Sequence, residues 1–240
     1  MTTRPLACAL LLGLFATAAA AERPAEIDAY RQTLAQVEAA RSPVSLEPLL
    51  AAAEAVQDAL MRIDDSDRAW LEIIGDDEFE ALKAELRGLQ LARGYDVYAQ
   101  PDGAFLLQLA TAKGRADDAA FFRLYDQLWS EQQLPKYLEL GNRPTPCVRY
   151  GTGVLPELYQ QWRDYAAQYP LAYLAHTKQT IADLEEAVAL GVCACTDAAD
   201  VERELSGFLK RFPTTPVAPQ IALRLKELKE HPDLRPVRCR

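Results

Sequence analysis

The sequence has few residues that could serve as catalytic bases near neutral pH. Its only histidines are His176 and His231, which lie in different segments and beside no nucleophile motif. General acid–base catalysis most often uses histidine, because the ordinary pKa of its side chain lies close to neutrality. No other stretch carries a catalytic or cofactor-binding motif. We therefore predict no catalytic residue, no metal ligand and no cofactor, and the sequence favours a non-enzymatic role.

A surplus of basic residues is also missing. The chain of 240 residues has 26 Lys and Arg against 35 Asp and Glu, which gives a net charge of -9. Binding to a nucleic-acid backbone requires clustered Lys and Arg, so a nucleic-acid partner is not expected. Hydrophobic residues make up 50% of the chain, and its 11 glycines follow no period. These features exclude an intrinsically disordered chain and a collagen-like one.

Long apolar runs are absent outside the N-terminus. Residues 1–21 combine Arg4, an apolar core over 10–15 and small residues over 19–21. This order is typical of a secretory signal peptide, so we expect cleavage after Ala21. No other stretch is long and apolar enough to cross a bilayer. The sequence thus predicts a periplasmic or secreted bacterial protein, in which 22–240 form a single helical domain without a transmembrane span.

Helical spacing dominates the rest of the chain. Apolar residues recur every three or four positions, which predicts a mainly all-α fold built from antiparallel helix pairs. The first two helices are marked by Ile27, Tyr30, Leu34 and Val37, and by Leu49, Val56, Leu60 and Ile63. Alternating residues near 88–99 predict a small β-hairpin. Prolines and glycines over 134–154 exclude a continuous helix there and mark a soft boundary between two halves.

The C-terminal half repeats itself with a period of 43 residues. The first set is Leu158, Trp162, Tyr165, Tyr169, Pro170, Leu174 and Ala175, and the second is Val201, Leu205, Phe208, Phe212, Pro213, Val217 and Ala218. Each set describes a helix that ends at an aromatic residue and a proline, followed by a helix that packs back on the first.

This pattern carries a resemblance to a known family. The segment over 208–213, Phe-Leu-Lys-Arg-Phe-Pro, followed by Ala218 and Leu225, resembles the tetratricopeptide-like helical pairs of bacterial envelope-assembly proteins. The resemblance covers residues 154–230, and the period is 43 residues rather than the usual 34. It implies α-solenoid character in the C-terminal half and a protein partner in the cell envelope.

Four cysteines remain after the predicted cleavage: Cys147, Cys193, Cys195 and Cys239. An even number in an exported chain predicts two disulfides. The predicted helix order brings all four to one end of the helix pairs, and a ring between Cys193 and Cys195 is strained. We expect Cys147 to pair with Cys193 and Cys195 with Cys239, and the crossed arrangement is the close alternative. Copper bound by Cys193 and Cys195, or zinc bound by all four, would instead define a thiol metal-handling protein.

The loop over 143–153 is the segment best suited to a ligand. Arg143, Arg149 and Tyr150 offer polar groups, and Gly151 and Gly153 could turn backbone amides toward an anion. A flexible turn is the simpler interpretation of these glycines. The preferred function is an exported, non-enzymatic interaction or scaffold protein of the bacterial cell envelope. The alternative is an envelope enzyme or small-ligand-binding protein that uses this loop.

Overall fold

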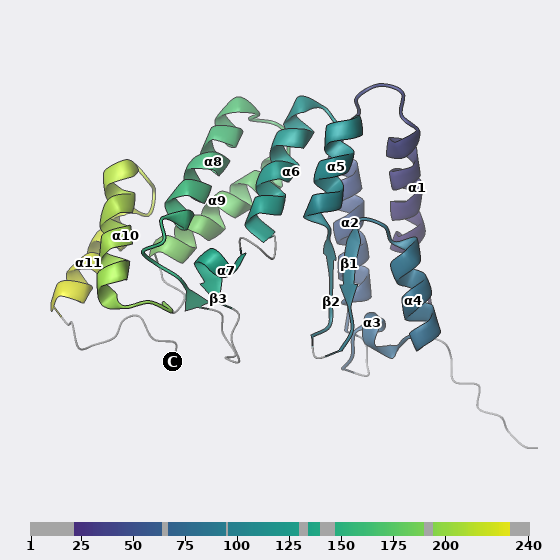
Figure 1. The fold of residues 1–240 in the computed structure, drawn as a ribbon, viewed down its shortest axis with the longest axis horizontal. Helices are drawn as coiled ribbons and strands as arrows, with labels where there is room; N and C mark the ends of the chain where they lie inside the picture. Colours follow the sequence, from purple (N-terminus) through teal and green to yellow (C-terminus); the bar gives the residue numbers. More distant parts are fainter. Residues whose placement is uncertain are drawn as a thin grey trace, which may run out of the picture.

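The computed structural model consists mainly of helices arranged in pairs (Figure 1). It describes residues 22–63, 67–94, 96–129, 134–139, 147–189 and 194–230. The predicted signal peptide over 1–21, together with Arg143, Cys193 and Cys239, lies outside the described residues. The predicted mainly all-α class is confirmed. Within the described ranges, the helices are accompanied by two short antiparallel strand pairs.

The first helix pair is α1 (Glu26–Ala39) and α2 (Glu47–Leu60), which pack against each other. The apolar residues at the predicted spacing are buried: Ile27, Tyr30, Leu34 and Val37 in α1, and Leu49, Val56 and Leu60 in α2. Ile63 continues the spacing in the sequence, but it follows the end of α2 and is exposed. Pro48 lies in the first turn of α2, where its missing N–H costs no helical hydrogen bond.

The predicted hairpin is confirmed and extends to Pro101. It follows two short helices, α3 (Trp70–Ile73) and α4 (Asp76–Glu85), and consists of β1 (Leu89–Ala92) and β2 (Tyr98–Pro101). Gly88 precedes β1 with φ of +88°, and a Cβ atom there would lie 2.6 Å from the Tyr30 hydroxyl oxygen. Glycine is therefore required at the point where the chain enters the hairpin.

The second helix pair is α5 (Gly103–Lys113) and α6 (Ala116–Trp129). Asp102 caps α5, because its carboxylate accepts hydrogen bonds from the first free N–H groups of the helix, those of Ala104 and Phe105. This pair leads from the N-terminal helices to the connector.

The predicted interruption over 134–154 is present in the part of it that the structure describes. It contains one helical turn, α7 (Leu134–Tyr137), and two strands of two residues each, β3 (Leu138–Glu139) and β4 (Cys147–Val148). The strands are antiparallel, and Glu139 is directly opposite Cys147.

Two further helix pairs follow. They are α8 (Val154–Gln168) with α9 (Leu174–Ala189), and α10 (Ala198–Arg211) with α11 (Ala218–Glu230). The repeated aromatic residues end α8 and α10 in nearly the same backbone conformation. Tyr169 has φ -129° and ψ 67°, and Phe212 has φ -127° and ψ 64°. The 43-residue repeat therefore describes two helix pairs with matching turns, whereas α-solenoid character stays a prediction.

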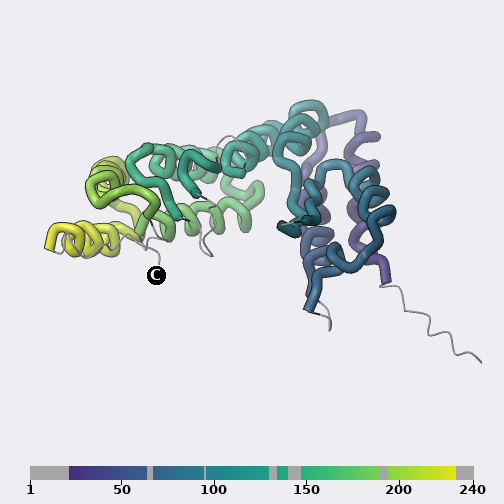
Figure 2. The backbone as a smooth tube through the Cα atoms, turned by 60° about the horizontal axis from the view of Figure 1, so that its bottom comes forward, coloured from purple at the N-terminus to yellow at the C-terminus, as the bar shows by residue number. Residues whose placement is uncertain are grey.

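The helix pairs follow one another along an arc, with α1 near one end and α11 at the other (Figure 2). One cluster of buried apolar side chains extends through the array from Ile27 to Leu228. Its centre is aromatic: the ring of Tyr173 stacks on Phe121 with centroids 3.8 Å apart, and Trp162 meets Phe121 edge to face. Within the residues that the structure describes, no helix is long and apolar enough to cross a membrane.

Candidate functional site

Residues 147–153 form the last part of the connector and lead into α8, and we call this segment the junction. β4 pairs with β3 on one side and meets the residues that follow α9 on the other. The carbonyl of Val148 accepts a hydrogen bond from the Cys195 N–H at 2.8 Å. The Arg149 N–H donates to the carbonyl of Tyr137 at 2.9 Å. Main-chain hydrogen bonds therefore fix this segment on both sides.

A disulfide joins Cys147 to Cys195, whose Cα atoms are 5.3 Å apart. The favoured pairing of Cys147 with Cys193, and with it that of Cys195 with Cys239, is wrong. The reason lies in the main chain, because the parallel bridge at Val148 and its hydrogen bond from the Cys195 N–H bring Cys195 beside Cys147. The observed bond belongs to the crossed alternative. The second bond of that alternative, between Cys193 and Cys239, falls outside the described residues.

Arg149 and Tyr150 of the predicted ligand loop have different surroundings. Arg149 is exposed, and its guanidinium lies 2.8 Å from the Glu139 carboxylate. Tyr150 is buried, and its hydroxyl donates to the carbonyl of Ala187 at 2.6 Å and accepts from Arg224 at 2.9 Å. Burial raises the pKa of Tyr150, and the adjacent Arg224 guanidinium opposes that rise. Tyr150 thus ties the loop to α9 and α11.

The glycine amides of the loop do meet an anion, and it is a carboxylate of the same chain. The Gly153 N–H donates to Oε2 of Glu204 on α10 at 3.0 Å. The amides of Gly151 and Thr152 interact with the same carboxylate. Both glycines have left-handed φ values, +82° and +73°, which turn successive N–H groups to one side. Burial raises the pKa of Glu204, while these backbone amides favour its charged form and oppose the rise.

Three charged residues at this junction were not among the predicted site residues. Glu204 is buried on the same face of α10 as Val201, and Arg224 is buried on the same face of α11 as Ile221. A charged residue within an apolar helical stripe was the sequence signal that could have indicated both. Glu139 gave no such signal, because its position beside Cys147 depends on the pairing of two very short strands.

His176 takes no part in this junction. Its Nε2 atom lies 2.7 Å from Oε1 of Glu54, and the pair joins α9 to α2. The hydrogen bond to Glu54 raises the pKa of His176, and burial opposes the rise. Among the described residues, no hydrogen bond links His176 to a serine, threonine or cysteine that could act as a nucleophile.

No protein-family model matches the chain. No curated protein sequence and no solved structure matches it either. The resemblance to tetratricopeptide-like helical pairs therefore stays an expectation. The function has to be argued from the residues and geometry of the chain itself.

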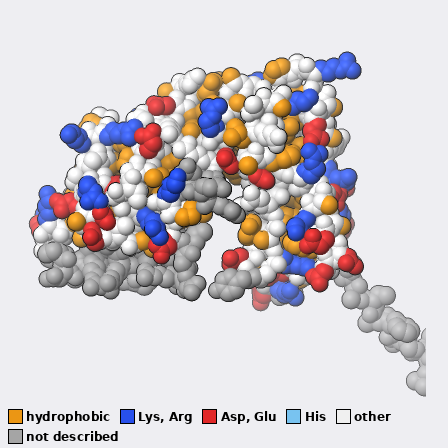
Figure 3. Space-filling model, viewed as in Figure 1, with side chains coloured by type: hydrophobic (Ala, Val, Ile, Leu, Met, Phe, Trp, Pro, Cys, Tyr) orange, Lys and Arg blue, Asp and Glu red, His pale blue; other side chains and the backbone are white. Residues whose placement is uncertain are grey.

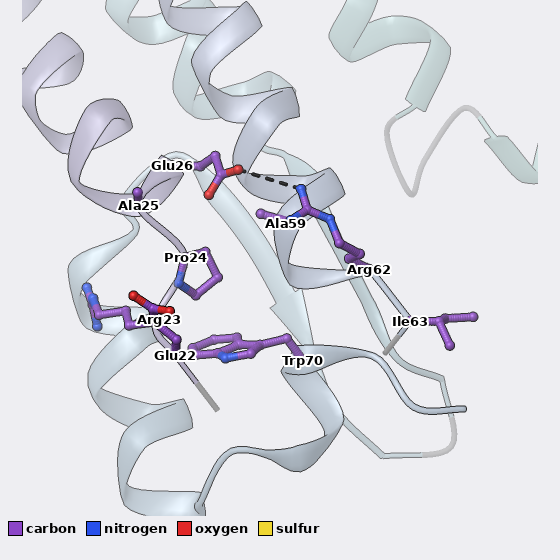
Figure 4. Close-up of a pocket in the computed structure, with 9 residues that line it drawn as sticks. All are labelled: Glu22, Arg23, Pro24, Ala25, Glu26, Ala59, Arg62, Ile63 and Trp70. Atoms are coloured by element: carbon purple, nitrogen blue, oxygen red, sulfur yellow. Dashed lines mark ion pairs between the residues drawn. The ribbon is translucent and has the colours of Figure 1, made fainter. Parts of the chain in front are cut away.

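A separate hollow of about 410 Å³ lies at the start of α1 (Figure 4). Pro24, Ala59 and the indole ring of Trp70 form its apolar part, and Arg62 lies 3.6 Å from the Glu26 carboxylate at its edge. Its lining includes carboxylates and guanidinium groups but no histidine, cysteine, serine or lysine among the described residues. The described part of its lining therefore offers no hydroxyl, thiol or amine that a base could activate.

Proposed function

We propose that the protein is an exported, non-enzymatic interaction or scaffold protein of the bacterial cell envelope. The proposal is supported by an array of helix pairs whose buried polar groups are used to join elements of the chain. Tyr150, Glu204 and Arg224, for example, connect the loop over 147–153 to three different helices. Helix pairs of this kind offer side surfaces and turns to partner proteins.

The observation that carries the proposal is the exposed apolar turn between α8 and α9. Leu171 is 82% exposed there, and Leu174 at the start of α9 is 39% exposed. Hydrophobic side chains also gather along the edge formed by the upper ends of α8, α6 and α5 (Figure 3). Exposed apolar side chains that lie near one another indicate a surface that another molecule covers.

The pair formed by α10 and α11 provides an internal comparison for this turn. The turn after α8 is closed by a hydrogen bond from the Ala172 N–H to the Tyr169 carbonyl at 3.2 Å. The turn after α10 is closed by the equivalent bond from the Thr215 N–H to the Phe212 carbonyl, also at 3.2 Å. Thr214 occupies the place that Leu171 has in the first turn. Since threonine serves in the same turn, folding does not require leucine at position 171.

Site-specific photo-crosslinking in living bacterial cells tests the proposal. The crosslinking residue p-benzoylphenylalanine replaces Leu171 in one strain and Thr214 in another, so the two probes occupy equivalent turns. We expect position 171 to yield a discrete covalent adduct with a protein that mass spectrometry identifies as an envelope component. Position 214 should yield none. Absence of an adduct at 171, or equal adducts at both positions, would contradict the assigned surface.

A substitution drawn from the same repeat separates binding from folding. Leu171→Thr should leave the thermal unfolding temperature unchanged, because threonine occupies the matching turn between α10 and α11. Burying a leucine side chain contributes about 1.5–3 kcal/mol, so the affinity for the crosslinked partner should fall by about tenfold or more. An unchanged affinity would place the interaction surface elsewhere.

The export part of the proposal has its own test. N-terminal sequencing of the protein recovered from the periplasm or the medium should begin at Glu22, since the predicted cleavage follows Ala21. A protein that retains Met1 and stays in the cytoplasm would contradict export.

The alternative, a ligand-binding or enzymatic loop over 143–153, has less support. Arg149 pairs with Glu139, Tyr150 bonds to α9 and α11, and among the loop amides the Gly153 N–H donates to Glu204. A small anion would have to displace the chain's own carboxylate from these amides.

A further inference from the structure

Three side chains that could ligate a metal meet beside β4. The Sγ atoms of Cys147 and Cys195 and a carboxylate oxygen of Glu139 all lie within 4.8 Å of one another. Cys147 is buried, Cys195 is half-buried and Glu139 is exposed. In the oxidised chain both sulfurs belong to the disulfide, so the group offers no thiolate.

The main chain holds these three residues together without help from the disulfide. Glu139 and Cys147 are directly opposite each other in the strand pair β3–β4. The Cys195 N–H donates to the carbonyl of Val148, the residue after Cys147, at 2.8 Å. These hydrogen bonds do not involve sulfur, and so the three side chains remain close to one another when the S–S bond is broken.

We propose that reduction of the Cys147–Cys195 disulfide creates a binding site for a thiophilic divalent cation of the Zn²⁺ class. A dithiol supplies two electrons and two protons; the S–S bond breaks, two thiols form, and the dithiol becomes a disulfide. Binding of the cation then releases both thiol protons to solvent and leaves two thiolates and the Glu139 carboxylate as ligands. A solvent molecule completes a tetrahedral set. The site goes beyond the proposed scaffold function and does not depend on it.

Arg149 competes with the cation for the Glu139 carboxylate. Its guanidinium lies 2.8 Å from the Glu139 carboxylate, with side-chain exposures of 45% and 47%. An ion pair this exposed is weak, so Glu139 can exchange Arg149 for a metal ion at little cost. The same positive charge repels a cation bound beside it. Removing Arg149 should therefore strengthen metal binding, an effect that a purely structural role of the residue does not produce.

Cobalt titration of the reduced full-length chain tests the site. Cys8→Ser, Cys193→Ser and Cys239→Ser are introduced together, so that Cys147 and Cys195 are the only cysteines left in the chain. After reduction and anaerobic removal of the reductant, Co²⁺ is added as a spectroscopic substitute for Zn²⁺. We expect one cobalt ion per chain, a thiolate-to-cobalt charge-transfer band, and displacement of cobalt by Zn²⁺. The oxidised chain should show no such band.

Single substitutions in this background identify the ligands. Cys147→Ser and Cys195→Ser should each abolish the charge-transfer band, and Glu139→Gln should weaken binding by at least about tenfold, the loss that even an outer-shell partner produces. Arg149→Ala should tighten binding. The matched control is Glu157→Gln, because Glu157 on α8 forms a similarly exposed ion pair with Arg211 on α10 at 3.1 Å. It should leave the affinity unchanged.

Several outcomes would overturn the proposal. The first is the absence of a cobalt band in the reduced background, and the second is a band that survives the loss of either cysteine. The third is an equal affinity of the Glu139→Gln and Glu157→Gln variants for cobalt. Binding by the wild-type chain that disappears in the background would also overturn it, because the ligands would then include Cys8, Cys193 or Cys239. If the reduced chain loses helical circular dichroism, metal should restore it through coupled folding, and failure to restore it counts against the site.

Discussion

The Asp118 carboxylate is completely buried and accepts three hydrogen bonds. The donors are the Leu46 N–H at 2.9 Å, the Arg115 N–H at 2.7 Å and the Tyr173 hydroxyl at 2.6 Å. They belong to the loop before α2, the start of α6 and the turn before α9. Tyr173 has φ of +48°, a conformation that tyrosine rarely adopts, and this hydrogen bond helps to hold it. One side chain thus joins three segments that are distant in the sequence.

Replacing Asp118 with alanine should lower the free energy of unfolding by at least about 3 kcal/mol. The substitution removes three hydrogen bonds to a charged group and leaves two buried donors, the Leu46 N–H and the Tyr173 hydroxyl, without this acceptor. Urea denaturation followed by circular dichroism measures the loss. The control is Asp117→Ala on the same helical turn, where the carboxylate pairs with the partly exposed Arg115 and should contribute about 1 kcal/mol or less. Equal losses in the two variants would contradict the role given to Asp118.

At the scale of single elements, the sequence predicted the longer helices and missed the shortest strands. The helices follow from apolar spacing, and the faces predicted for α1 and α2 are buried. The hairpin follows from alternation near residues 88–99. β3 and β4 could not be predicted, because two residues cannot show alternation and their pairing depends on the course of the connector. The Cys147–Cys195 pairing was ranked second, as part of the crossed alternative, for the same reason.

The pair formed by His176 and Glu54 links two helices from different halves of the chain, α9 and α2. The Nε2 atom of His176 lies 2.7 Å and 2.9 Å from the two carboxylate oxygens of Glu54. This hydrogen bond raises the pKa of His176, burial lowers it, and the charges of Glu54 and Glu47 on α2 add to the rise. The folded chain therefore binds the His176 proton more tightly than the unfolded chain does.

The resulting stability should decrease as the pH rises. The pKa of His176 is higher in the folded chain than in the unfolded chain, where it is about 6.5. The stabilisation is therefore fully present below about pH 6.5 and is lost as the pH rises through the higher pKa of the folded chain. For a pair this accessible to solvent, the contribution is at most about 1 kcal/mol. Urea denaturation from about pH 6 to pH 8 should show this loss in the wild type and not in His176→Gln. Glu54→Gln should flatten the profile in the same way, and an unchanged slope in both variants would contradict the assignment.

At the scale of the whole molecule, the sequence located the junction and misjudged its connections. It predicted that cysteines would gather at one end of the helix pairs, and it gave an anion at the loop amides over 151–153 only as the alternative to a flexible turn. The structure places Cys147 beside Cys195 and supplies the anion from Glu204. Both partners are chosen by packing between segments about 50 residues apart. Local spacing holds no information about such contacts, whereas it does determine the helix faces.

The Cys147–Cys195 bond should contribute about 4 kcal/mol to the free energy of unfolding, because it closes a loop between residues 48 positions apart and restricts the unfolded chain. Peptide mapping of the unreduced protein should recover Cys147 joined to Cys195, and a Cys147–Cys193 peptide would contradict the structure. The double variant Cys147→Ser with Cys195→Ser should then unfold at a lower urea concentration. Its m-value should also rise, because an unfolded chain freed from this loop exposes more surface to urea. A loss of stability without a rise in the m-value would indicate that the bond acts through packing in the folded state.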